Sequence, residues 1–472
     1  MSARRIHQHA APKIVPELDP GFRPAALFHR AFDAAAAESG ARPVDIAIEQ
    51  ADGSTFHWRT MALPSQHPDA DLNFVNLERQ VKFLLWSRGG HRVHVHAPDD
   101  LARRLRDHYT KSATGRFDAD IMGARIYERP FEIVEVGGAG ELPPERHNAI
   151  PLGRHLEGCR IGFDLGASDR KAAAVVDGQV VFSEEIEWHP VVETDPQWHF
   201  EQIMDSLTRA AAYLPRVDAI GGSAAGVYVA NEVKVASLFR GVPPDLFSTR
   251  AKGLFLELKR AWGGIPFEIV NDGEVTALAG SMALKDNAVL GIAMGSSEAA
   301  GYVTPDGTIT SWLNELAFAP IDYQPDGPLD EWSGDAGCGV QYFSQQAVGR
   351  LARAAGLDFP ADLPLPEQLK RVQELMQQSD PRATALYRTI GVYLGYGAAH
   401  YASFYTVRHI LVLGRVTTGS GCDLMLEEAR RVLSVEFPAL AARLAFHVPD
   451  EQTKRHGQAI AAASLPAPAP TD

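Results

Sequence analysis

Apolar and polar residues alternate in the first 150 residues with the periods of both strands and helices. A turn at Ala51-Asp-Gly-Ser separates two short alternating segments, which predicts a β-hairpin. Apolar residues then recur at helical spacing until Gly89-Gly90, where glycines are a typical stop signal. The predicted elements are hairpin strands at 46–48 and 56–58, a helix at 77–86, a strand at 92–97 and a capped amphipathic helix at 99–109. We therefore predict an accessory α/β domain over residues 25–150.

The region beyond residue 158 contains an internal repeat. Cys159-Arg-Ile-Gly-Phe-Asp-Leu-Gly-Ala-Ser precedes an apolar strand, an Asp177-Gly178 turn and a further strand. Ala288-Val-Leu-Gly-Ile-Ala-Met-Gly-Ser-Ser precedes an apolar stretch, an Asp306-Gly307 turn and a further strand. Four positions of the first unit, Gly162, Gly166, Asp177 and Gly178, recur 129 residues later. A repeat of this length indicates a duplicated domain, because solenoid units are roughly 20–50 residues long.

Each half of the repeat continues into a segment with helical spacing of apolar residues, at 200–214 and 341–355. We predict two lobes, at residues 158–286 and 287–464. Residues 1–24 and the Pro- and Ala-rich end at 465–472 are predicted to be flexible.

Composition narrows the class of protein. The chain has 472 residues and a net charge of −14, which disfavours nucleic acid or an anionic membrane as the main partner. Nucleotides stay possible, since backbone amides and a metal ion can hold phosphates within an acidic protein. The three cysteines lie far apart, and the N-terminus has no apolar signal region, so we expect a reduced, cytoplasmic protein without a membrane span.

The first repeat unit carries residues suited to phosphate binding. Gly166 permits a tight turn, where exposed amides and the Ser168 hydroxyl can face phosphate oxygens. Asp164 is a candidate for holding Mg²⁺, directly or through water. Lys171 or Arg170 supplies a positive charge. Taken alone, such a turn is also common in hairpins that bind no ligand.

The second unit repeats this pattern as Gly295-Ser296-Ser297, and two facing hairpins can clamp one polyphosphate. Further along, the apolar run at 409–413 enters a Gly-rich loop at Gly414. Glycine there lets a purine lie against the backbone, although an ordinary strand–loop–helix connection explains the segment equally well.

A third candidate site lies just before the second unit. The apolar strand Phe267-Glu-Ile-Val delivers Asn271 and Asp272 to its carboxyl end, where ligands bind in open α/β sheets. A carboxylate there can take the proton from an attacking hydroxyl during phosphoryl transfer. Either residue can also simply cap the helix that follows. We favour catalysis for Asp272.

Together these motifs resemble the ROK family of sugar kinases and repressors, within the actin/hexokinase superfamily. Asp164-Leu-Gly-Ala-Ser resembles its first phosphate motif, and Gly295-Ser-Ser-Glu-Ala-Ala-Gly its second. Asn271-Asp272 resembles its catalytic pair, and Val412-Leu-Gly-Arg-Val its adenosine motif. The resemblance covers residues 158–464. It implies a duplicated, ribonuclease H-like two-lobe core, to which the N-terminal α/β domain is an addition.

The resemblance also implies a function. ATP would be bound with Mg²⁺, Asp272 would be the general base, and Asn271 with Glu315 would bind the hydroxyls of a sugar acceptor. The sequence departs from the family where Phe318 replaces a histidine and Val340 replaces a sugar-binding glutamate. Only Cys338 remains of the family's zinc motif, so a structural zinc is not expected.

Two function classes follow from these observations. The first is an ATP- and Mg²⁺-dependent sugar kinase. The second is a sugar- or nucleotide-sensing regulatory protein that keeps the fold without turnover, which the altered sugar pocket favours. A DNA-binding repressor is disfavoured by the charge and by an N-terminal region of strands rather than a helix-turn-helix. An ATPase without an acceptor, and a homodimer, stay open.

Overall fold

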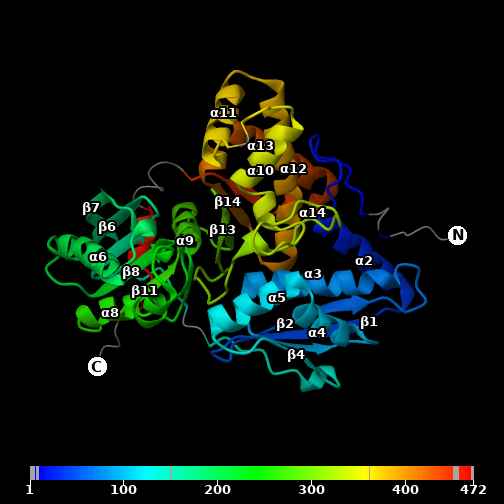
Figure 1. Cartoon of the computed structure of the whole chain (residues 1–472), viewed down its shortest axis with the longest axis horizontal. Coiled ribbons are helices and arrows are strands. Elements are labelled where there is room, and N and C mark those ends of the chain that lie inside the picture. The colour runs from blue at the N-terminus through cyan, green and yellow to red at the C-terminus, as the bar shows by residue number, and fades with distance from the viewer. Residues whose placement is uncertain (1–5, 7–9, 149–150, 361, 450–456, 469–472) are drawn as a thin grey trace.

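The computed structural model describes residues 6, 10–148, 151–360, 362–449 and 457–468. These residues form three parts: an N-terminal α/β domain, a first lobe and a second lobe (Figure 1). Figure 1 shows the first lobe on the left, the second lobe at the top and the N-terminal domain below it. The predicted duplicated α/β core with an added N-terminal α/β domain is confirmed.

The N-terminal domain is a four-stranded sheet in the order β2-β1-β3-β4. The predicted hairpin is confirmed, because β1 and β2 pair antiparallel with Glu49 opposite Thr55. The predicted helix before Gly89 is α3, which lies between this sheet and the second lobe (Figure 1). The elements are α2 (Ala25–Ser39), β1 (Arg42–Glu49), β2 (Thr55–Ala62), α3 (Asn73–Arg88), β3 (Arg92–His96), α4 (Leu101–Lys111), α5 (Ala113–Ala119), η2 (Asp120–Tyr127) and β4 (Glu132–Glu135).

The first lobe is a five-stranded sheet in the order β11-β8-β5-β6-β7. Strands β5, β8 and β11 are parallel, and β5-β6-β7 form antiparallel hairpins. The elements are β5 (Cys159–Leu165), β6 (Asp169–Val176), β7 (Gln179–Glu187), α6 (Pro196–Ala211), β8 (Ala219–Ala224), β9 (Val227–Val229), β10 (Glu232–Val235), α7 (Pro244–Leu246), α8 (Leu254–Ala261), β11 (Phe267–Asn271) and α9 (Asp272–Leu284).

The second lobe repeats this topology with a four-stranded sheet in the order β13-β12-β14-β15. Strand β12 pairs antiparallel with β13 and parallel with β14, as β5 pairs with β6 and β8. The elements are β12 (Val289–Met294), β13 (Glu298–Val303), α10 (Gln345–Ala354), α11 (Leu365–Gln377), α12 (Pro381–Phe404), β14 (His409–Leu413), α13 (Ser420–Glu436), α14 (Pro438–Ala441), β15 (Ala445–His447) and α15 (Gln458–Ala463).

The two repeat units differ in the segment that follows the Asp-Gly turn. In the first half, Asp177-Gly178 leads into β7, as predicted. In the second half the predicted strand after Gly307 is reduced to isolated bridges of Ile309 with Val303 and Leu152. Beyond Ile309 the chain contacts the N-terminal domain, where the Ser311 carbonyl accepts a hydrogen bond from Gln50 at 3.2 Å.

The last helix crosses back to the first lobe, so the second lobe does not extend to residue 464 as predicted. Helix α15 packs on β5 and β8 of the first sheet. Glycines on those strands make the approach possible, because a Cβ at Gly162 or Gly221 would overlap the α15 carbonyls of Ala459 and Ala462. On the opposite face of β5, Phe163 stacks against Phe255 of α8.

The two ends assigned to flexible segments are packed where the structure describes them. Residues 10–24 lie against the second lobe. Phe22 is fully buried there, and the centroids of its ring and the Tyr393 ring are 4.8 Å apart. At the other end Leu465 is fully buried, and its carbonyl accepts from the Gly153 amide at 3.1 Å. Both segments carry apolar side chains that find cover in the core. The rest of the predicted flexible ends, at 1–5, 7–9 and 469–472, falls outside the described residues.

The N-terminal domain is joined to the second lobe by a continuous hydrophobic core. One cluster of buried side chains contains Phe83 and Trp86 of α3 together with Tyr401 and Phe404 of α12. The Phe83 and Phe404 rings stack with centroids 4.0 Å apart. The N-terminal domain therefore shares one hydrophobic core with the second lobe. Among the helices that the structure describes, none has the length and hydrophobicity needed to cross a membrane.

Candidate active site

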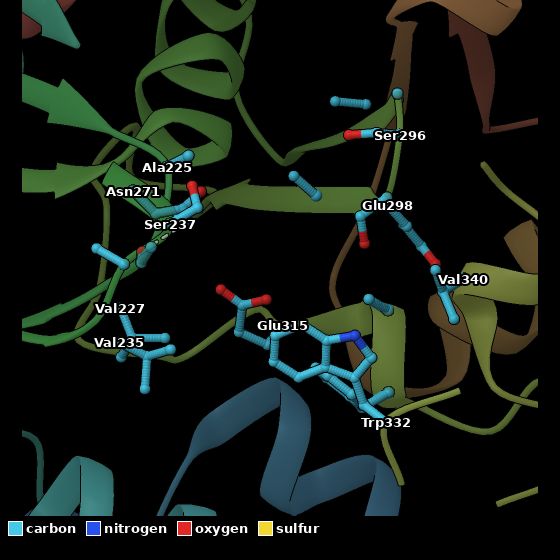
Figure 2. A pocket seen from close by; sticks show the side chains of 18 of the residues that line it. Ala225, Val227, Val235, Ser237, Asn271, Ser296, Glu298, Glu315, Trp332 and Val340 are labelled. Atoms are coloured by element: carbon cyan, nitrogen blue, oxygen red, sulfur yellow. Dashed lines mark hydrogen bonds between the residues drawn. The ribbon is translucent and has the colours of Figure 1, made fainter. Parts of the chain in front are cut away.

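A cavity of about 560 Å³ opens between the two lobes. The first lobe contributes Asn271 and Asp272, and the second lobe contributes the Gly295–Ser297 hairpin. The N-terminal domain closes a third side with Trp86 and Phe117. Figure 2 shows the Glu315 carboxylate pointing into the cavity, whereas the Glu298 side chain runs toward Val340.

The sheet register places Asn271 and the first hairpin at one edge. Leu165 of β5 and Asn271 of β11 both pair with Ala224 of β8, so the parallel strands end together. The Asn271 Oδ1 accepts from the Gly273 amide at 2.7 Å and caps α9. Its Nδ2 donates to the Gly226 carbonyl at 2.8 Å. The capping interpretation is thus confirmed for Asn271, whereas its contact with the hydroxyls of a sugar substrate stays a prediction.

Asp272 follows at the first turn of α9 and faces the cavity. Burial raises the pKa of its carboxyl to about 6, and the negative charge of Asp164 adds to this effect. The Gly273 amide donates to its Oδ1 at 3.1 Å, which opposes the rise. No ion pair joins this carboxylate to a cation among the described residues, so it is available to take a proton near neutral pH.

The first hairpin adjoins the cavity, although its predicted residues Asp164, Gly166, Ser168 and Lys171 are not among the lining side chains. Asp164 accepts from the Ser223 hydroxyl at 2.6 Å. Burial raises the pKa of Asp164, which Ser223 and Lys171 oppose.

The structure decides between the two candidate cations of this hairpin. Lys171 lies opposite Asp164 in the β5–β6 pairing, and its Nζ is 3.3 Å from Asp169 Oδ1. Arg170 is buried and turned toward α6, where it pairs with Asp205 at 3.0 Å. Lys171 is therefore the cation beside Asp164.

Both hairpins present free backbone donors. In the first, the Gly166 amide donates to the Asp169 carbonyl at 2.9 Å, while the amides of Ala167 and Ser168 donate to no described residue. In the second, the Gly295 amide donates to the Ser297 carbonyl at 2.9 Å, and the exposed Ser296 amide has no described acceptor. Such amides fit the phosphate oxygens of a nucleotide.

Gly414 directly follows β14 and brings the neighbouring loop against the end of β12, next to the second hairpin. Its φ is +99°, and a Cβ there would come within 2.5 Å of the Met294 carbonyl oxygen. Glycine is required at this position, because other residues are strained at this φ and cannot approach the hairpin as closely. Gly414 and Ser296 both line the cavity. The nucleotide contact expected for Gly414 stays a prediction.

Glu315 is held in place by the N-terminal domain. Its amide donates to the Trp86 carbonyl at 2.9 Å, and the preceding Asn314 amide donates to the Ser87 carbonyl at 3.0 Å. Burial raises the pKa of the Glu315 carboxyl to about 7, and the charge of Asp272 adds to this. The last turn of α3 thus positions a side chain of the second lobe.

Sequence motifs missed several residues that line the cavity. Glu298 begins β13 and is 3% exposed. Three aromatic rings form a cluster across the domain boundary, with Trp86 and Phe318 at 4.2 Å and Phe117 and Phe318 at 5.8 Å between centroids. A charged residue among the small residues of the second motif was the available signal for Glu298. The aromatic cluster had no signal, since it forms only when α3 docks on the second lobe.

Comparisons with known proteins show which fold this chain has. No family model and no curated protein matches the chain. A ROK hexokinase from Thermus thermophilus superposes with a TM-score of 0.51 at 20% identity, covering 64% of this chain and 97% of the hexokinase. The core has the ROK hexokinase fold. The predicted resemblance to the ROK and actin/hexokinase architecture is thereby confirmed at the level of the fold.

A second solved structure shares this fold. It is a ROK family transcriptional regulator, a homologue of the E. coli MLC protein, with a TM-score of 0.51 at 18% identity. The match covers 66% of this chain and 79% of the regulator. About a third of the present chain therefore has no counterpart in either structure.

Proposed function

We propose that this chain is a ROK-type kinase that transfers phosphate from ATP to a hydroxyl of a sugar or sugar-like acceptor. One observation carries the proposal: Asp272 stands at the carboxyl edge of β11, inside a cavity that is lined by the second hairpin and adjoined by the first. Both hairpins offer free amides. Asp272 would accept the proton of the attacking hydroxyl, which its raised pKa favours. The hairpins would hold the transferring group in line with that hydroxyl.

The residues at the first hairpin fit the expected cofactors. Asp164 is a carboxylate that no described cation engages in an ion pair, beside Lys171, and such an oxygen donor suits Mg²⁺ bound directly or through water. Gly166, Ser168, Gly295, Ser296, Ser297 and Gly414 are the proposed nucleotide-binding residues. Mg²⁺ bound with ATP would neutralise charge on the phosphates. Asn271 and Glu315 are proposed to orient the acceptor.

The test is ADP release from Mg²⁺-ATP with a panel of sugars, comparing the wild type with Asp272→Asn. We expect acceptor-dependent ADP release that falls at least about 100-fold in the variant, as for loss of a general base. The matched control is Asp245→Asn, an exposed carboxylate of α7 in the same lobe that does not line the cavity. Equal rates for the wild type and Asp272→Asn would refute the proposal.

The alternative is a sensor of the same fold, and the altered lining favours it. Phe318 and Val340 line the cavity where a histidine and a glutamate were expected, so two polar contacts to a sugar are missing. A sensor would bind sugar or nucleotide without releasing ADP under any condition in the panel. Binding of labelled operator DNA would then separate a DNA-binding regulator from one that is not.

A further inference from the structure

Apolar side chains form a large part of the lining of the cavity between the lobes. The N-terminal domain contributes Phe117, Ile121 and Ile126, and the first lobe contributes Val227 and Val235. These side chains offer no hydrogen bonds, so a sugar hydroxyl placed against them would lose its hydration without replacement. An acceptor that fills this part of the cavity therefore needs an apolar group of its own.

This apolar wall is built where the N-terminal domain meets the first lobe. Val227 and Val235 are partners in the β9–β10 hairpin, and Figure 2 shows their side chains next to each other at the cavity. Glu128, which directly follows the π-helix η2, pairs with Lys252 of the first lobe at 2.6 Å and with Lys234 of β10 at 3.4 Å. These ion pairs hold η2 and its isoleucines against β10. Helices of this rare type are frequent at functional sites.

An exposed tryptophan also lines the cavity. The Trp332 side chain is 64% exposed, and it forms no hydrogen bond, ion pair or ring contact with any residue that the structure describes. Figure 2 shows its indole at the same cavity as the Glu315 carboxylate. An indole presents a large flat apolar face, which a ligand with a similar face would cover.

The turn that carries Trp332 is fixed by buried polar contacts. The Asp330 Oδ2 accepts from both the amide and the hydroxyl of Ser333 at 2.6 Å. The Asp330 amide donates to the Asp335 carbonyl at 2.8 Å, and the Asp335 carboxylate pairs with Lys82 of α3 at 2.9 Å. Because the turn is already ordered, little backbone freedom is lost when a ligand packs against its side chain.

Helix α3 also relates Trp332 to the acceptor. Lys82 of α3 holds the turn, and the Trp86 carbonyl of the same helix accepts from the Glu315 amide at 2.9 Å. Glu315 is proposed to orient the acceptor, whereas Gly414, proposed to contact the nucleotide, lies in the loop after β14. The indole is therefore assigned to the acceptor rather than to the adenine ring.

We propose that the acceptor of this cleft is a sugar with an aromatic substituent, an aryl glycoside, and that Trp332 stacks on the substituent. The inference rests on the proposed function, because it takes the cleft as the acceptor site. The apolar wall excludes water from the aromatic group, and the hydroxyls of the sugar stay available to Asp272 and Glu315.

The experiment measures the affinity of the full-length protein for matched glycosides by calorimetry, with a non-hydrolysable ATP analogue present. The pairs are the phenyl and methyl β-glycosides of glucose, galactose and mannose, which differ only in the apolar group. We expect the phenyl glycoside of at least one pair to bind at least about tenfold more tightly than its methyl partner, as for burial of an aromatic ring. Equal or weaker binding of the phenyl glycoside in all three pairs would overturn the inference.

Variants assign the preference to residues. Trp332→Ala removes the indole, and we expect the ratio of the phenyl to the methyl affinity to fall at least about fivefold. Val235→Thr keeps the shape of the wall and adds a hydroxyl, so it should lower the same ratio. Tyr213→Ala is the matched control, because Tyr213 is 57% exposed and does not line the cavity.

Two results with the variants would also overturn the inference. The first is a preference for the phenyl glycoside that persists unchanged in both Trp332→Ala and Val235→Thr. The second is a Trp332→Ala protein that loses affinity for the ATP analogue while its preference for the phenyl glycoside is unchanged, which would assign the indole to the nucleotide.

The outcomes separate this inference from the proposed kinase function. Phosphorylation of plain sugars without any preference for the phenyl glycoside would remove the inference and leave the kinase. Selective binding of the phenyl glycoside without ADP release would support the inference and remove the kinase.

Discussion

Lys82 and Asp335 form a buried ion pair, with Nζ and Oδ2 2.9 Å apart, that ties the N-terminal domain to the loop before Cys338. Lys82 also pairs with Asp118 at 3.0 Å, and Arg79 pairs with Asp335 at 2.9 Å. Although burial opposes ionisation, Arg79 and Lys82 hold the pKa of the Asp335 carboxyl well below its usual range. This network organises the loop in which the sequence had lost the zinc ligands of the ROK resemblance.

Removal of Lys82 is expected to destabilise the whole chain. Lys82→Met leaves Asp118 and Asp335 buried with less compensation, which lowers the free energy of unfolding by about 3–5 kcal/mol. Denaturant titration measures the loss. Adding Asp118→Asn to Lys82→Met should restore part of it, and a Lys82→Met protein as stable as the wild type would contradict the structural role of the network.

Treatment with a zinc chelator is expected to leave the thermal stability of the protein unchanged, because we expect no structural zinc. Burial raises the pKa of the Cys338 thiol to about 12, so this side chain stays a thiol and is a poor metal ligand. Dialysis against 1,10-phenanthroline should not shift the melting temperature. Elemental analysis that found about one zinc ion per chain would show this prediction to be wrong.

The activity is expected to depend on the ionisation of Asp272. A general base acts only when it has lost its proton, so kcat/KM should rise with pH and level off above an inflection near the pKa of about 6. The pH profile with saturating Mg²⁺-ATP measures this. An inflection near 4, where an unperturbed Asp titrates, would mean that Asp272 is solvated and not the base.

Glu298 is expected to make stability fall as pH rises. Burial, with the charge of Glu315, raises the pKa of the Glu298 carboxyl from 4.5 to about 8. The folded state therefore binds this proton more tightly than the unfolded state, and the free energy of unfolding decreases between those pH values by roughly 5 kcal/mol. Glu298→Gln removes this loss, so it should be more stable than the wild type at pH 8 and closer to it at pH 5.

The matched control for that measurement is Glu187→Gln, whose side chain is 82% exposed. It should follow the wild type at every pH. A Glu298→Gln variant less stable than the wild type at pH 8 would show that the carboxylate is compensated in the folded protein.

Gly414 is expected to be needed for nucleotide binding. Gly414→Ala places a Cβ against the Met294 carbonyl oxygen and should displace the loop from the second hairpin. Gly419→Ala is the matched control, since its φ of +85° is also positive but nothing lies within 4 Å of the added Cβ. Both variants carry backbone strain of about 1 kcal/mol. Only Gly414→Ala should weaken binding of a fluorescent ATP analogue, and equal affinities in the two variants would contradict the placement of the loop.

The duplicated core could be predicted from the sequence, because the residues that mark it are close together in the chain. Glycines and a short hydroxyl at Gly166–Ser168 and Gly295–Ser297 mark turns whose geometry few other residues allow. The strand before Asn271 was visible as an apolar run, and parallel strands bring their carboxyl ends together. Asp272 could therefore be assigned to the cleft before its surroundings were known.

The surroundings of that carboxylate depend on contacts between distant parts of the chain. The return of α15 to the first lobe depends on glycines far apart in the chain, Gly162 and Gly221. The wall formed by Trp86 and Phe318, and the ion pair of Lys82 with Asp335, join residues more than 200 positions apart. Such contacts follow from the docking of whole elements, in which burial of apolar area outweighs local preference, and no short sequence pattern encodes them.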